Sequence, residues 1–237
     1  MSVDPRWGAE DREAKALAIR CTLGAMLDTV PSGTWVDMGC GSGGIIAALA
    51  PHVERAIGID PEPWPRWPVL AATASNLEFR QLDRMPDDLR GVVDVVVCNH
   101  VYEHASDPRA LIADIHRALR PGGYCYFAGP NWLWPIEPHV HWPFVHWMSR
   151  RFTVALANRL APRKAADLDA NAHTVWRLRR WFREAGFDWV PAEHARALAA
   201  PATERSLGVR LLSCLPAGMA AALSPIMPTF VFVLQKR

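Results

Sequence analysis

A glycine-rich segment between a short apolar strand and a helix most constrains the fold of this chain. The segment reads Val36-Asp-Met-Gly-Cys-Gly-Ser-Gly-Gly44. Gly39, Gly41 and Gly43 allow the backbone to turn sharply and to approach a ligand closely. Backbone N–H groups at the start of the following helix would face that ligand. The segment therefore predicts a ligand-binding loop where a strand ends and a helix begins.

The first half of the chain alternates between short apolar strands and helices. Valines crowd the fourth strand, which favours burial on both of its faces. This alternation predicts a parallel sheet that is covered by helices on both sides. Strands are predicted at 34–38, 56–60, 77–82, 92–98 and 124–128, and helices at 10–29, 44–49 and 108–119.

The pattern changes after residue 130. Tryptophan, proline and histidine then crowd an irregular stretch that continues into an arginine-rich helix. A helix at 174–185 follows, with Thr174 as its N-cap and Gly186 as its stop. Strands at 187–190 and 229–234 enclose a proline-broken apolar segment. We interpret 1–237 as a single domain, with 10–130 as a cofactor-binding core, 131–172 as an insertion or lid, and 173–237 as a closing helix, strands and apolar covering segment.

Composition excludes several classes of protein. Half of the 237 residues are apolar, and 26 basic side chains nearly balance 24 acidic ones. This apolar fraction and low net charge exclude intrinsic disorder. The charge balance also gives no reason to expect a nucleic-acid partner. The charged N-terminus does not resemble a signal peptide, and no apolar run reaches the roughly 18–20 residues of a spanning helix. Five cysteines without a CxxC pair predict reduced, mostly buried thiols. We therefore expect a cytoplasmic protein.

Acidic residues lie at the ends of three successive predicted strands: Asp37, Asp60 and Asp83. The carboxyl ends of parallel strands form the ligand-binding edge of open α/β folds. A carboxylate at Asp37 is unfavourable beside a pyrophosphate but suits a ligand that carries an ammonium and a sulfonium group. The glycines alone also fit the dinucleotide pattern G-x-G-x-x-G through Gly44, so glycine spacing leaves the ligand open.

Five motifs in order resemble the class I S-adenosylmethionine-dependent methyltransferases. They are Val36–Gly44, Gly58–Pro61, Asp83-Arg-Met-Pro86, Asp94–Pro108 and Leu119–Gly123. Within that family the Glu-His pair after the fourth strand is most similar to small-molecule O-methyltransferases of the ubiquinone-biosynthesis type. The resemblance implies a Rossmann-like α/β fold, a seven-stranded mixed sheet flanked by helices with an antiparallel last strand, and an irregular insertion after strand five.

The resemblance also implies roles for individual residues. Asp37 and the glycines would hold the methionine part of S-adenosyl-L-methionine, Asp60 the ribose and Asp83 the adenine, while Asn99 and His100 would border the methyl group. The full set of expected cofactor-binding residues is Asp37, Gly39, Cys40, Gly41, Gly43, Asp60, Pro61, Asp83 and Asn99.

Methyl transfer to a hydroxyl group needs a base, because a neutral alcohol is a poor nucleophile. His104 is the first candidate, His100 the second, and His139, next to Glu137-Pro138 in the insertion, the third. His100, Glu103 and His104 also form H-x-x-E-H, so a divalent metal there is an alternative to our prediction of no metal site.

The insertion carries a surplus of basic and aromatic residues. Between His141 and Arg180 there are eight Lys/Arg and two Asp, together with several Trp and Phe. Such a segment suits peripheral membrane contact or a lipid-linked acceptor. The alternative is an ordinary solvated helix face over an aromatic core.

The sequence thus predicts an S-adenosylmethionine-dependent methyltransferase that acts on a small-molecule or lipid-like acceptor, at oxygen. A nicotinamide oxidoreductase is the first alternative, although no lysine lies near Tyr102, Tyr124 or Tyr126 to form the expected catalytic pair. A non-catalytic S-adenosylmethionine-binding protein is the second.

Overall fold

The structure, a computed structural model, describes residues 9–136, 142–144, 147–148, 150–160, 172–200 and 205–237. Its strands are β1 (Thr34–Met38), β2 (Arg55–Asp60), β3 (Leu77–Gln81), β4 (Val93–Asn99), β5 (Leu119–Pro130), β6 (Phe187–Pro191) and β7 (Thr229–Lys236). Its α-helices are α1 (Ala9–Met26), α2 (Gly44–Leu49), α3 (Trp67–Ala71), α4 (Pro108–Ala118), α5 (Arg150–Leu160), α6 (Val175–Ala185), α7 (Glu193–Leu198), α8 (Leu207–Cys214) and α9 (Ala217–Leu223).

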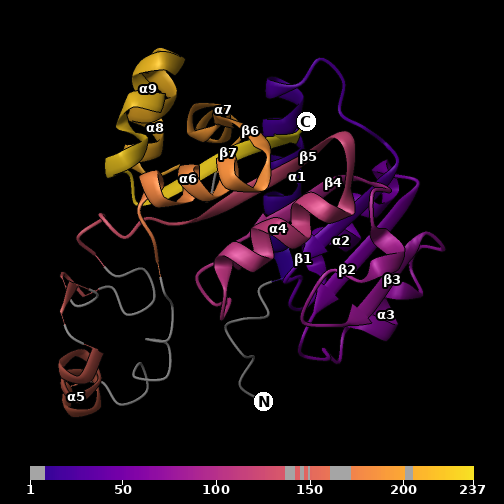
Figure 1. The fold of residues 1–237 in the computed structure, drawn as a ribbon, viewed down its shortest axis with the longest axis horizontal. Helices are drawn as coiled ribbons and strands as arrows, with labels where there is room; N and C mark the ends of the chain where they lie inside the picture. The colour runs from indigo at the N-terminus through magenta and orange to yellow at the C-terminus, as the bar shows by residue number, and fades with distance from the viewer. Residues whose placement is uncertain (1–8, 137–141, 145–146, 149, 161–171, 201–204) are drawn as a thin grey trace.

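The strands form one mixed sheet in the order β3-β2-β1-β4-β5-β7-β6 (Figure 1). The pairs from β3 to β5 are parallel, and β7 runs antiparallel to both β5 and β6. The sheet order reverses between β1 and β4, which is the position where open α/β sheets bind their ligands. The predicted seven-stranded mixed sheet with an antiparallel last strand is confirmed.

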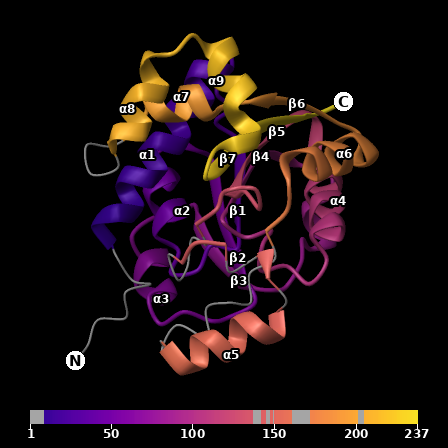
Figure 2. The ribbon, with the colours of Figure 1, turned by 90° about the vertical axis from the view of Figure 1, so that its left-hand side faces the viewer.

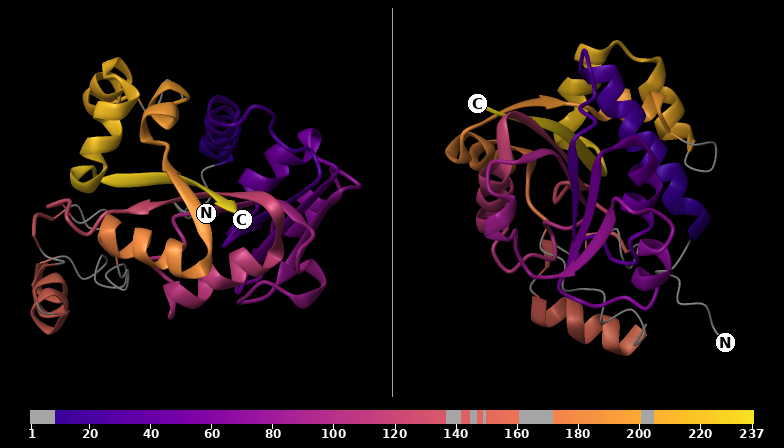
Figure 3. Two further views of the ribbon diagram at one scale, coloured as in Figure 1. Left: turned by 45° about the horizontal axis from the view of Figure 1, so that its top comes forward. Right: turned by 90° about the vertical axis from the view of Figure 1, so that its right-hand side faces the viewer.

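Helices cover both faces of the sheet, as the buried valines of β4 predict. Figure 2 shows α1, α2 and α3 on one side of the strands and α4 and α6 on the other. The right-hand view of Figure 3 shows the same arrangement with α1 and α4 on opposite sides. Alternate residues of each strand therefore enter two separate cores: Val95 and Val97 of β4 pack with α1 and α2, and Val96 and Cys98 with α4 and α6.

Aromatic rings fix the antiparallel half of the sheet. Phe127 of β5 is paired in register with Phe232 of β7 and also contacts Phe182 of α6, with ring centroids 5.1 Å apart. Phe230 and Phe232 are fully buried beside it. Aromatic pairs of this kind add about 0.5–1.5 kcal/mol each beyond the area they bury, so they hold β7 against β5.

Several element boundaries differ from the sequence predictions. β5 begins at Leu119 instead of residue 124, because Leu119 pairs with Val93 before a register shift in the ladder. The predicted proline-broken segment contains α7, α8 and α9, and the last two helices pack against α7. Thr174 caps α6 and Gly186 ends it, as predicted.

Three of the five cysteines are buried, in line with the expectation of mostly buried thiols. Cys40, Cys98 and Cys125 are buried, whereas Cys21 and Cys214 are exposed. Among the described helices none is both long and apolar enough to cross a bilayer. The described part of the insertion includes α5, which lies beyond the end of β5 and away from the sheet (Figure 1).

Candidate functional site

The glycine loop lies between the ends of β1 and β2 and is bonded to both. The backbone N–H groups of Gly39 and Cys40 donate to the carbonyl oxygen of Ile59, at 2.7 and 3.0 Å. Gly39 has a φ of 72°, and a Cβ atom at this position would lie 2.5 Å from Cγ2 of Val101. Only glycine fits this backbone position without strain and without displacing the chain after β4.

Gly43 occupies a second restricted position, at the N-cap of α2. Its φ is 81°, and a Cβ atom would lie 2.4 Å from the ring of Phe79. Phe79 stacks on Trp67 with centroids 5.2 Å apart, and the Trp67 indole donates to the carbonyl oxygen of Gly41 at 2.9 Å. Trp67 and Phe79 thus pack against the glycine loop and hold it in place. Neither contact could be predicted from the sequence, because Trp67 is an isolated aromatic residue in a proline-rich segment and Phe79 is an isolated aromatic residue in a short strand.

Asp60, at the end of β2, connects the loop to the next strand. Its Oδ2 atom accepts from the backbone N–H of Gly41 at 2.8 Å, and Oδ1 accepts from the N–H of Glu62 at 3.0 Å. A carboxylate has about four acceptor positions, so two remain for hydroxyl groups of a ligand. The geometry is compatible with the predicted ribose contact.

Asp37 is a buried acid with an unsatisfied oxygen. The residue is 2% exposed, and its Oδ2 atom has no hydrogen-bond partner. Burial raises the pKa of Asp37 to about 7; the Arg12 guanidinium lowers it and the Asp60 carboxylate raises it further. A buried acceptor without a partner is costly, so a cationic donor would be stabilised at this position.

The remaining predicted cofactor residues differ in their surroundings. Cys40 is buried behind the loop, and burial raises the pKa of its thiol. Pro61 is exposed directly after Asp60, and Asn99 is half-buried at the end of β4. Asp83 is exposed, with Oδ1 3.6 Å from Nε of Arg84. The assignment of Asp83 to an adenine amine stays a prediction.

The chain after β4 brings His100 beside a buried acid. His100 has a φ of 57°, and its N–H donates to the carbonyl oxygen of Ala128 at 2.9 Å. Its Nδ1 atom lies 3.4 Å from Oε1 of Glu103, a fully buried carboxylate whose two oxygens lack hydrogen bonds. His104 is exposed on the next turn.

Tyr102 holds this segment in place. Its buried hydroxyl donates to the carbonyl oxygen of Pro130 and accepts from the N–H of His173 at 3.1 Å. Tyr102 therefore joins the ends of β4 and β5 to the start of the α6 region. No spacing pattern in the sequence marks this structural role of Tyr102.

A cavity of about 700 Å³ opens beside Asn99 and His100. Its floor is formed by β5 and β7, including Tyr126, Ala128 and Val231, and its walls by α1, α7, α8 and α9. Most of the lining is apolar. Among the described residues, the polar lining side chains besides Asn99, His100 and the Tyr126 hydroxyl are Lys15, Glu193, Arg196, Ser206 and Thr229.

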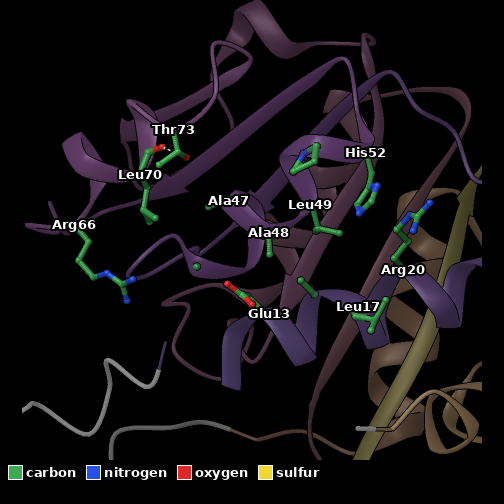
Figure 4. A pocket seen from close by; sticks show the side chains of 13 residues that line it. Glu13, Leu17, Arg20, Ala47, Ala48, Leu49, His52, Arg66, Leu70 and Thr73 are labelled. Carbon is green, nitrogen blue, oxygen red and sulfur yellow. Dashed lines mark hydrogen bonds between the residues drawn. The ribbon is translucent and has the colours of Figure 1, made fainter. Parts of the chain in front are cut away.

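Other parts of the chain add little to the candidate site. A second hollow of about 580 Å³ lies between α1, the outer face of α2 and the α3 region, and Figure 4 shows its mixed lining, including Glu13, Arg20 and Arg66. None of the predicted cofactor-binding or catalytic residues lines it. His139, with Glu137, His141 and His146, lies outside the described residues. In the described chain no group of three His, Cys, Asp or Glu side chains is placed to hold a metal ion.

The residues at the sheet edge fit S-adenosyl-L-methionine. The unsatisfied Asp37 carboxyl suits a cationic amino-acid group, and the glycine loop provides the close backbone approach that the predicted binding mode requires. Asp60 keeps free acceptor capacity toward ribose hydroxyls. By contrast, a pyrophosphate would lie near two carboxyl groups, which is electrostatically unfavourable.

Comparisons with known proteins agree with this fit. A family model described as a methyltransferase domain matches residues 9–192. The ubiquinone biosynthesis O-methyltransferase of Pseudomonas paraeruginosa is 32% identical over 106 residues, which are 41% of this chain and 44% of that protein. The enzyme of the same description from Acinetobacter baumannii is 28% identical over 102 residues, 40% of this chain and 43% of that protein. The chain thus matches less than half the length of these curated relatives.

Solved structures share the fold. An S-adenosylmethionine-dependent methyltransferase from Mesorhizobium loti has a TM-score of 0.60 at 16% identity and covers 94% of this chain and 100% of its own. Geranyl diphosphate C-methyltransferase from Streptomyces coelicolor has a TM-score of 0.55 at 15% identity and covers 96% and 77%. The family match decides against the nicotinamide oxidoreductase alternative. The chain belongs to the class I S-adenosylmethionine-dependent methyltransferases, a family whose methyl donor is S-adenosyl-L-methionine.

Proposed function

We propose that the chain methylates a hydroxyl group of a small, largely apolar molecule bound in the 700 Å³ cavity. The observation that carries the proposal is that this mostly apolar cavity has Asn99 and His100 in its lining, at the end of the strand where the methyl group is expected. The curated relatives, which are O-methyltransferases by name, support oxygen as the methylated atom.

The methyl donor supplies a carbon that is already activated by a sulfonium. The protein must then align the acceptor oxygen with that carbon, exclude water and remove a proton. In the proposed site the apolar walls of α1, α8 and α9 exclude water, and Asp37, Asp60 and the glycine loop hold the donor.

His100 is the base that the geometry favours. It lines the cavity, whereas His104 does not, so we place His100 ahead of His104. The Glu103 carboxylate, 3.4 Å from Nδ1, favours the tautomer with its proton on Nδ1. Nε2 would then accept the proton of the acceptor hydroxyl. Glu103 acts through His100 and is a positioning residue.

Transfer of a labelled methyl group tests the proposal. The protein is incubated with S-adenosylmethionine labelled at the methyl carbon and with matched apolar acceptors, namely an alkylphenol, its methyl ether and the corresponding aniline. We expect label on the phenol, none on the ether, and a lower rate for the aniline. Transfer to the aniline alone would overturn the assignment to oxygen. Addition of EDTA separates a metal-dependent reaction from the metal-free reaction that we propose.

Contact with lipid through the insertion is a further part of the proposal. Trp132, Phe144, Trp147 and Phe152 are each more than one-third exposed in its described part, and Arg151 and Arg159 are exposed on α5. Aromatic rings and cations in this combination suit an anionic interface. Co-sedimentation with anionic vesicles, but not with neutral ones, is the expected result. The cytoplasmic location stays a prediction.

A further inference from the structure

The acceptor cavity contains one buried acid that the proposed reaction does not use. Glu193 begins α7 directly after β6, is 4% exposed, and lines the cavity. Its Oε1 atom accepts from the Ser224 hydroxyl and, at 3.5 Å, from the backbone N–H of Val231. Its Oε2 atom is buried and has no hydrogen-bond partner. Burial raises the pKa of Glu193.

No neighbouring cation satisfies the free oxygen directly. The Arg179 guanidinium lies over the ring of Trp189, 4.6 Å from its centroid, and acts on Glu193 only through its longer-range charge. No ion pair of Glu193 is found within the described part of the chain. A buried carboxyl oxygen without a donor is unfavourable unless a ligand supplies one.

The sheet register shows how far Glu193 lies from Asn99, which marks the end of the cavity where methyl transfer is proposed. Asn99 pairs with Ala128, and Ala128 pairs with Val231, so these residues form one row across β4, β5 and β7. Neighbouring strands are about 4.8 Å apart, which places the ends of this row roughly 10 Å from each other. Glu193 is bonded to the Val231 end, and Ala128 and Val231 form an apolar floor between the two polar ends.

Charge limits what could bind at the Glu193 end. Lys15 and Arg196 line the same cavity, so a cationic ligand group would face two positive charges as well as one acid. A neutral hydrogen-bond donor meets no such repulsion. An entirely hydrocarbon group would supply no donor to Oε2, which is already buried and without a partner.

We infer that Glu193 is a specificity-determining residue, and that the natural acceptor carries a second neutral donor, such as a hydroxyl group, about 10 Å from the methylated oxygen and separated from it by an apolar body. This inference rests on the proposed function, because it takes the cavity as the acceptor site. It differs from that proposal in requiring two polar groups on the acceptor.

Two probes of nearly equal shape test the inference. para-(Hydroxypropyl)phenol and para-butylphenol differ only in a terminal hydroxyl or methyl group. Their affinities are measured by isothermal titration calorimetry with S-adenosylhomocysteine present. A purely apolar site would favour the butyl probe. We expect the wild-type protein to bind the hydroxyl probe at least as tightly, and a clear preference for the butyl probe would overturn the inference.

Substitutions of Glu193 give the second test. In Glu193→Met the preference should shift toward the butyl probe by on the order of tenfold, because the hydroxyl then lacks its partner. Glu193→Gln, which can still bond a hydroxyl group, should restore most of the preference. Ser224→Ala is the matched control: it removes the donor to Oε1 but keeps the free oxygen, so the preference should persist.

The outcomes separate the two proposals. If Glu193 only anchors the Ser224 region, Glu193→Met and Ser224→Ala should change the affinities of both probes alike, and the inference is wrong. If the hydroxyl preference holds but no methyl group reaches any phenol, the proposed reaction fails while the donor-binding role of Glu193 stands. Thermal unfolding and S-adenosylhomocysteine affinity of each variant verify that its fold is intact.

Discussion

The carboxylate of Asp60 accepts a hydrogen bond from the backbone N–H of Gly41 at 2.8 Å, across 19 positions of sequence. The bond joins the glycine loop after β1 to the end of β2. One side chain therefore both shapes the loop and presents its remaining acceptor positions to the ligand. Replacing Asp60 should therefore change both the conformation of the glycine loop and the affinity for the ligand.

Asp60→Ala should weaken S-adenosylhomocysteine binding by about 2–3 kcal/mol, or roughly 30- to 150-fold, because a charged acceptor is lost from the ribose and from the loop. Asp60→Asn should lose less, since its amide oxygen can still accept from Gly41. Calorimetry measures both affinities, and circular dichroism verifies folding. An unchanged affinity in a folded Asp60→Ala variant would remove Asp60 from the ribose site.

The pH dependence of cofactor binding should follow Asp37. Its pKa of about 7 in the ligand-free protein means that a proton must leave before the carboxylate can pair with the ligand's ammonium group. Between pH 5 and 7 the affinity for S-adenosylhomocysteine should therefore rise with pH, by up to about tenfold per pH unit. Asp37→Asn should bind weakly and without this dependence. A wild-type affinity that is flat over the same range contradicts the assignment.

The same carboxyl group should make the ligand-free protein less stable at high pH. Because the folded state holds this proton more tightly than the unfolded chain does, its stabilisation is complete below pH 3.8 and is lost as the pH rises through about 7. At pH 8, Asp37→Asn should raise the unfolding free energy, by up to about 4 kcal/mol. Denaturant unfolding at pH 5 and 8 measures the unfolding free energy of both proteins. Equal stability of the wild type and Asp37→Asn at both pH values would contradict a destabilising effect of the ionised Asp37.

Gly39→Ala should disrupt the cofactor site through its steric effect. The added Cβ atom would lie 2.5 Å from Val101 and force both the loop and the segment that carries His100 to move. We expect S-adenosylhomocysteine affinity to fall at least tenfold. Gly91→Ala is the matched control, because Gly91 has a similar φ of 70° and no atom within 4 Å of its Cβ position. It should lose only about 1–2 kcal/mol of stability and keep its affinity.

His100→Gln should lower kcat strongly, by about 10²- to 10⁴-fold, while leaving cofactor affinity nearly unchanged. His104→Gln should have a smaller effect, because His104 does not line the acceptor cavity. Glu103→Gln should lower kcat more than it raises KM, and Glu103→Asp should recover part of the loss. Steady-state rates with the alkylphenol acceptor decide between the two histidines. A fully active His100→Gln variant with an inactive His104→Gln variant would reverse their roles.

Much of the core could be predicted because its signals are local. The run Val36–Gly44 needs positive φ angles at particular positions, and only glycine supplies them cheaply, so a strand–loop–helix unit is visible in the sequence. Neighbouring valines of β4 face opposite helical layers. The run of valines therefore predicted burial on both faces of the strand. The acids at strand ends followed from the parallel arrangement of the strands.

The rest depends on contacts between distant segments. Tyr102 bonds to Pro130 and His173, and Trp67 bonds to Gly41, but none of these pairs has a spacing that marks it. The same holds for Glu193, which sits in a region that the sequence identified only as an apolar cover. The sequence predicts His104 ahead of His100 as the base, and our proposal reverses that order, because spacing along the chain does not show which ring lines a cavity.

The sequence by itself determined the fold class, the glycine loop and the acids beside it, since backbone conformation and strand periodicity are properties of neighbouring residues. Only the tertiary structure decided which carboxyl oxygens of Asp37, Glu103 and Glu193 are buried without a hydrogen-bond partner. Burial is produced by segments far apart in the chain. Burial raises the pKa of Asp37 and of Glu193, and one oxygen of each carboxyl group is left without a hydrogen-bond partner.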